Sequence, residues 1–65
     1  MNTEEKIKLL TDVREASRAL GRILDGGYLK VRADAKILHD DCGNALASLC
    51  FLALALEAEI GTDNL

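Results

Sequence analysis

A cluster in the second half of the chain, His39 to Cys42, holds the residue types used in catalysis and metal binding. His39 and Cys42 are three apart, so both lie on one side of a helix. Nucleophilic catalysis also needs a base and a group that orients it, but His39 is the only histidine. A structural zinc needs four ligands, and this pair supplies two per chain. We therefore expect no catalytic site, no metal site and no cofactor, and predict a protein that is not an enzyme.

A second set of residues has the chemistry of anion binding. Arg14, Arg18 and Arg22 are four apart and form a basic ridge on a helix. All eight Lys and Arg residues lie in the first 36 residues, whose net charge is +2, and the remainder carries −5, which gives −3 in total. A negative total disfavours non-specific binding to nucleic acid. The ridge therefore stays a candidate surface either for nucleic acid or for a protein partner, together with a short segment that contains Tyr28, Lys30 and Arg32.

Two cysteines and the N-terminal residues bear on the cellular compartment. Cys42 and Cys50 are eight residues apart, which is about 12 Å along a helix and too far for a disulfide. We expect reduced thiols, which are typical of a reducing compartment. The first residues include Glu4 and Glu5, where a secretory signal would carry basic residues. These features predict a cytoplasmic protein, in the host cytoplasm if a phage encodes it.

The elements that position these residues follow from periodicity. Residues 3–25 repeat apolar side chains every three or four positions, which predicts an amphipathic helix that ends at Gly26 and Gly27. Residues 28–33 alternate with a period of two and read as a short strand. Residues 35–60 read as a second helix, with Gly61 as its stop. We treat residues 1–65 as a single small dimerising domain.

The second helix is too apolar for a 65-residue monomer to cover. Residues 45–56 are hydrophobic except for Ser48, and such a helix needs a core or a membrane around it. Twelve residues span about 18 Å, short of the roughly 30 Å of hydrocarbon in a bilayer, so we expect no membrane insertion. We predict instead a homodimer with a shared core. The expected core residues are Leu29, Val31, Leu46, Leu49, Phe51, Leu52 and Leu56.

Two architectures fit this reading. The first is a mainly α protomer of helix, short strand and helix, in which the strands of two copies pair as an antiparallel ribbon of an intertwined dimer. The alternative is an all-α antiparallel hairpin that dimerises as a four-helix bundle. In either case a hydrophobic groove on the dimer would accept a partner protein's amphipathic helix. The alternative function is a small dimeric nucleic-acid-binding regulator that uses the basic ridge and the strand face.

The order of helix, strand and helix over residues 3–25, 28–33 and 35–60 resembles a family of small early proteins of lambdoid bacteriophages, encoded between the exonuclease and excisionase genes. The resemblance implies a dimeric accessory regulator of phage development or host takeover that binds a host or phage protein. A second resemblance is to the plasmid protein Rop, an RNA-binding four-helix bundle. It rests on Glu4-Glu5-Lys6, Leu38-His39-Asp40 and Asp63-Asn64-Leu65. It implies the hairpin fold, although the first helix lacks the aromatic residue that Rop's RNA face uses.

Overall fold

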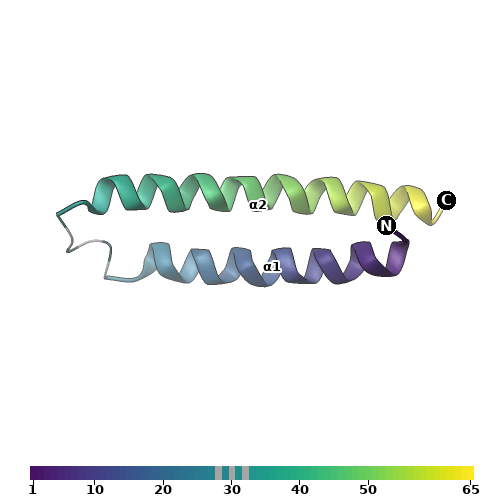
Figure 1. Ribbon diagram of the computed structural model, residues 1–65, viewed down its shortest axis with the longest axis horizontal. Coiled ribbons are helices and arrows are strands. Elements are labelled where there is room, and N and C mark those ends of the chain that lie inside the picture. Colours follow the sequence, from purple (N-terminus) through teal and green to yellow (C-terminus); the bar gives the residue numbers. More distant parts are fainter. Residues whose placement is uncertain (28, 30, 32) are drawn as a thin grey trace.

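The computed structural model describes residues 1–27, 29, 31 and 33–65 and is mainly helical (Figure 1). Helix α1 spans Thr3–Asp25, the range expected for it. Asn2 caps its N-terminus, because the side-chain Oδ1 accepts a hydrogen bond of 2.9 Å from the backbone N–H of Glu5. Glu4 and Glu5 in the first turn interact favourably with the positive, N-terminal end of the helix dipole. At the other end, the N–H of Gly26 donates to the carbonyl of Arg22.

Helix α2 spans Ala35–Asp63 and is longer than predicted. It continues through Gly43 and past Gly61, so the expected stop at Gly61 is wrong. A glycine inside a helix costs about 1 kcal/mol relative to alanine, and contacts made by the last turn offset that cost. Lys6 Nζ donates to Asp63 Oδ2 at 2.9 Å, and Thr3 Oγ1 donates to the same oxygen at 3.0 Å. These bonds tie the end of α2 to the start of α1.

The two helices pack antiparallel along their whole length and form one long hairpin. Its principal extents are 50 × 15 × 14 Å, and both termini lie at the same end (Figure 1). The mainly α class is confirmed, and the arrangement within one chain is that of the helical-hairpin alternative.

The contact between the helices follows a repeat of seven residues. In α1 the apolar seam contains Leu10, Val13, Leu20 and Leu24, with Ser17 between them, at spacings of three and four. In α2 the corresponding positions are Leu46, Leu49, Ala53, Leu56 and Ile60. Leu10, Val13 and Leu56 are buried, and Leu9, Leu49, Ala53 and Ile60 pack against them. This spacing keeps each seam facing the other helix, as in a coiled coil.

The connection between the helices differs from the predicted strand. Successive alternate residues of a strand share one face, yet Leu29 is 6% exposed and Val31 is 82% exposed. Leu29 and Ala33 lie in turns and Val31 in a bend, so these described positions form no strand. Tyr28, Lys30 and Arg32 lie outside the described residues. An antiparallel hairpin needs only a short connection, and the described residues contain no second strand with which such a segment could pair.

Candidate interaction surfaces

The cluster of His39 to Cys42 lies on the surface near the start of α2. His39 is exposed and lines a shallow hollow of about 260 Å³ beside the connection, with Leu29, Ala35, Lys36 and Asp40. Cys42 is half-buried and its thiol is free. In the part of the chain that the structure describes, no group of three or more His, Cys, Asp or Glu residues is placed to hold a metal ion. The hollow brings the His39 imidazole, the Asp40 carboxylate and the Lys36 side chain near an apolar wall.

The residues expected in a shared dimer core divide into two groups. Leu29 and Leu56 are buried, and Leu46 and Leu49 are half-buried on the seam of α2. Val31, Phe51 and Leu52 are exposed in the single hairpin. The first group therefore packs within the single hairpin. The second group is exposed and is available for contact with another molecule.

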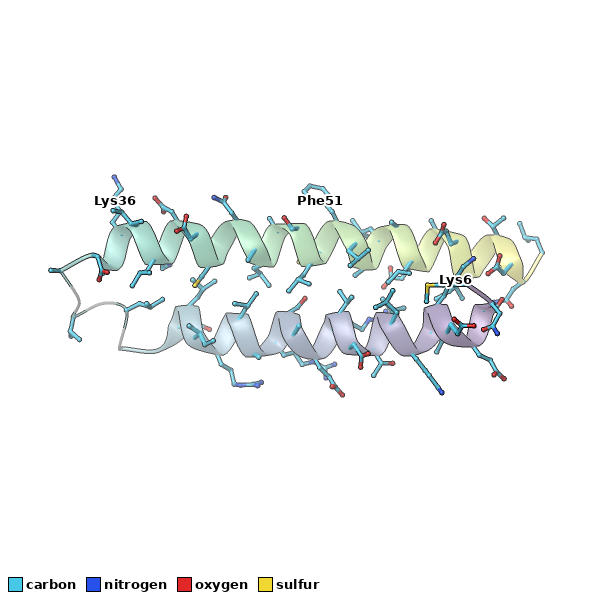
Figure 2. The ribbon with its side chains drawn as sticks, viewed as in Figure 1. Lys6, Lys36 and Phe51 are labelled. Atoms are coloured by element: carbon cyan, nitrogen blue, oxygen red, sulfur yellow. The ribbon has the colours of Figure 1, made fainter. Side chains whose placement is uncertain are left out.

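Helix α2 exposes large apolar side chains over most of its circumference. Phe51 is 71% exposed and points away from α1 (Figure 2), and Leu54 and Leu52 are 61% and 42% exposed. Ile37 is also exposed. One helix cannot cover a neighbour that is apolar all round, so α1 covers only the seam. The remaining apolar surface of α2 needs another cover.

The total accessible surface area of the hairpin is larger than that of a compact monomer of the same mass. The accessible surface is 4789 Å², whereas a compact monomer of 7.0 kDa would expose about 4,000 Å². The difference of roughly 750 Å² is close to the ~800 Å² that each partner contributes to a standard-size protein interface. The long shape of the hairpin, with four buried side chains among the described residues, accounts for the excess. The exposed area is sufficient for one stable interface.

One side of the hairpin combines cations with apolar surface, and we call it the basic flank: Arg14, Arg18, Cys50 and Leu54. An open hollow of about 410 Å³ lies there, and Ser17 and Ala53 also line it. Arg14 Nη2 donates to Glu57 Oε1 at 2.5 Å, and both side chains are about half exposed. Among the described residues Arg18 has no ion-pair partner within 4 Å. The flank therefore offers one engaged and one unengaged guanidinium beside a nonpolar wall.

The opposite side carries nonpolar residues on both helices, and we call these the apolar flank: Leu9, Ala16, Ile23, Ala45 and Leu52. Glu59, seven residues after Leu52, continues this side of α2 at its C-terminal end. A step of two residues turns a helix by about 200°. Ala16 therefore lies opposite Arg14 and Arg18, and Leu52 lies opposite Cys50 and Leu54. Leu9, Ala16 and Ile23 are seven apart, as are Ala45 and Leu52. Ala16, Ile23, Ala45 and Leu52 are exposed, and Leu9 is half-buried.

The structure describes one part of the predicted basic surface. Arg14, Arg18 and Arg22 are exposed on α1, as the spacing indicates. The strand face of Tyr28, Lys30 and Arg32 lies outside the described residues. Sequence reasoning missed the parts of the basic flank that come from α2, namely Cys50, Leu54 and Glu57. It also missed the stripe of Leu9, Ala16 and Ile23, whose seven-residue spacing was the available signal.

Helix α2 also has the length and composition of a membrane-spanning helix. It is 29 residues long, its best 18-residue window has a mean hydropathy of 1.6, and 6% of that window is buried in the hairpin. The sequence analysis considered a run of twelve residues, eleven of them hydrophobic, and the continuous helix presents a longer segment. Core helices of soluble proteins meet the same criterion when protein covers them. No protein family, curated protein or solved structure matched the chain.

Proposed function

We propose that this protein is a non-enzymatic regulator that acts as a homodimer by binding another protein. Two hairpins pack through their apolar flanks into a four-helix bundle, which is the all-α dimer considered from the sequence. The observation that carries the proposal is the apolar surface that α2 leaves exposed, at Phe51, Leu52 and Leu54. The hairpin as a whole exposes about 750 Å² more than a compact monomer of its mass, which is close to the share of one partner in a standard-size interface. Oligomerisation is one of the ways in which so short a chain completes its core.

The choice of flank follows from charge and spacing. The apolar flank of α1 carries Leu9, Ala16 and Ile23 at the seven-residue repeat that packs helices against helices. The basic flank would bring Arg14 and Arg18 of one copy against the same face of a second copy, because a two-fold interface uses one patch twice. Like charges in an interface are unfavourable. The apolar flank is therefore the self-association surface.

The biological setting that we propose is an accessory role in phage development or host takeover, in the host cytoplasm. Its support is the resemblance to the early phage proteins in size and in the order of helix, short strand and helix, of which the structure has the two helices and no strand at the described residues of the connection. Nucleic-acid binding is the alternative function, and the unengaged Arg18 favours it. The net charge of −3 per chain, doubled in a dimer, disfavours a phosphate backbone as the main ligand. We therefore place protein binding first.

Sedimentation equilibrium in buffer without detergent tests the homodimer directly. The expected result is a species of twice the 7.0 kDa chain mass that dissociates only on dilution. A folded monomer at all concentrations would overturn the proposal, because the apolar flank would then be stable in water. Recovery only in detergent, with partition into phosphatidylcholine vesicles, would also overturn it and would assign α2 to the bilayer.

A further inference from the structure

We propose that the basic flank binds an acidic amphipathic helix of a partner protein. This inference deepens the proposed binding role by naming the chemistry of the partner, and it rests on that role. The occupant is a helix with one apolar stripe and carboxylates along the edge of that stripe. The dimer leaves this side of each hairpin open, because self-association uses the opposite flank.

The hollow supplies an apolar floor of the right kind. Cys50, Ala53 and Leu54 line it from α2, and Ser17 lines it from the seam of α1. Leu54 is exposed and Phe51 follows on the outer side of the same helix. A shallow groove between two adjacent antiparallel helices accepts a third helix through side chains at positions i, i+3, i+4 and i+7 of that third helix. The volume of about 410 Å³ accommodates one or two large aliphatic side chains of the partner.

The two arginines specify the charge of the partner. Arg14 and Arg18 are one helical turn apart and both border the hollow. Carboxylates one turn apart on a partner helix match this spacing, because residues four apart lie on the same side of that helix. Guanidinium groups bind carboxylates through paired N–H donors. The basic flank is thus suited to bind two acidic side chains next to an apolar contact.

Glu57 shows how a carboxylate is held at this edge. Its Oε1 accepts from Arg14 Nη2, and the pair is solvent-exposed. An exposed ion pair contributes at most about 1 kcal/mol, so a partner carboxylate can displace Glu57 at low cost. The intramolecular pair occupies the site weakly in the absence of a partner. Removing the Glu57 charge should therefore strengthen binding of an acidic helix.

An acidic helix fits better than a nucleic acid for two reasons. The side chains from α2 that line the hollow beside the arginines are Cys50, Ala53 and Leu54, whereas non-specific single-stranded nucleic-acid sites place aromatic side chains there for base stacking. The second reason is the net charge of −3 per chain, which disfavours the densely charged phosphate backbone of a nucleic acid. A protein helix with separate carboxylates contacts Arg18 first and then exchanges with Glu57.

The probe is a fluorescently labelled 18-residue amphipathic peptide with leucines at i, i+3, i+4 and i+7 and glutamates along one edge. Titration of the full-length chain should give saturable binding. Arg18→Glu and Leu54→Asp should each weaken it at least tenfold, and Glu57→Gln should strengthen it a few-fold. Lys8→Glu is the matched control, because it makes the same charge change at an exposed position of α1 that is not in the hollow. It should leave affinity unchanged.

Labelling of Cys50 gives an independent readout of the same site. In a Cys42→Ser variant, Cys50 is the remaining thiol, and it is exposed in the hollow. Bound peptide should slow the reaction of Cys50 with a maleimide at least several-fold. A version of the peptide with lysine in place of glutamate should give no protection.

Three results would overturn the inference. The first is equal affinity for the acidic and the lysine peptides. The second is an unchanged affinity in Arg18→Glu. The third is displacement of the acidic peptide by duplex DNA or structured RNA at a lower concentration than unlabelled acidic peptide requires. Sedimentation of the same variants separates this inference from the proposed dimer. Arg18→Glu should keep the dimer while losing the peptide. A monomeric wild type that still binds the acidic peptide would refute the dimer and leave the basic flank supported.

Discussion

Substitution of Leu52 by aspartate is the sharpest test of the apolar flank. Leu52 is 42% exposed in the single hairpin, so an aspartate there can reach water when the chain is monomeric. In the proposed dimer, the second copy covers this exposed part. Full burial of a leucine is worth about 1.5–3 kcal/mol, so the part covered by the second copy contributes about 1 kcal/mol for each chain.

The introduced carboxyl group adds a second cost. Burial of a polar group without a partner costs about 1–3 kcal/mol, and more if the group stays charged. Both terms occur twice, because a two-fold interface contains the residue of each copy. The dimer should therefore weaken by at least about 4 kcal/mol, which is roughly a thousandfold in Kd. Sedimentation equilibrium over a wide concentration range measures this change.

Leu54→Asp is the matched control for this experiment. It makes the same substitution two residues along α2 at a side chain that is 61% exposed on the basic flank. Its dimer should be within a few-fold of the wild type. Circular dichroism at 222 nm monitors helicity in all three proteins, so loss of the dimer is distinguished from loss of the fold. An intact dimer in Leu52→Asp, or a dimer lost only in Leu54→Asp, would refute the reasoning.

Three further predictions concern the hairpin itself. Leu56 is 4% exposed, so Leu56→Ala should lower the free energy of unfolding by about 2–5 kcal/mol, seen as a lower urea midpoint; an unchanged midpoint would place Leu56 outside the core. Gly21 lies inside α1, and outside the helix's own backbone no atom stands within 4 Å of an added Cβ. Gly21→Ala should therefore raise the free energy of unfolding by about 0.5–1 kcal/mol, seen as a higher Tm. A lower Tm would mean that another chain packs closely there. Hydrogen bonds from Lys6 and Thr3 hold the pKa of Asp63 below its ordinary value of 3.8. The stabilisation by ionised Asp63 is therefore complete above that ordinary value and is lost as pH falls through the lowered pKa. The Tm difference between wild type and Asp63→Asn should close over that interval, and a difference that persists at lower pH would contradict the ion pair.

Local signals in the sequence were sufficient for the first helix. Asn2, Glu5 and the apolar repeat determine where α1 begins and which side faces inward, and all of them act within one turn. The end of α2 was not predictable in the same way. Lys6 and Asp63 are 57 residues apart, and their contact exists only once the helices are antiparallel. A glycine signal at position 61 was outweighed by this distant pair.

The strand prediction for the connection was wrong, and the two flanks were missed, for a related reason. The alternation over residues 28–33 is short, and six residues cannot distinguish a strand from a turn when no other strand is available. Assignment of Cys50 and Leu54 to the side of Arg14 and Arg18 requires the register of the hairpin. The sequence does show the excess of apolar residues in α2, and the structure adds which of them the hairpin covers.

The register also explains the uneven charge of the sequence. Cations from the N-terminal half of α1 meet acids from the C-terminal end of α2, as Lys6 does with Asp63 and Arg14 with Glu57. Arg18 lies further toward the connection, where α2 runs through residues 45–56 and carries no charge. The two ion pairs are consistent with the antiparallel alignment, and Arg18, which has no ion-pair partner among the described residues, stands beside the most apolar part of α2. Desolvation there strengthens a contact between Arg18 and a carboxylate, so an incoming acidic helix gains most where the chain itself provides no acid.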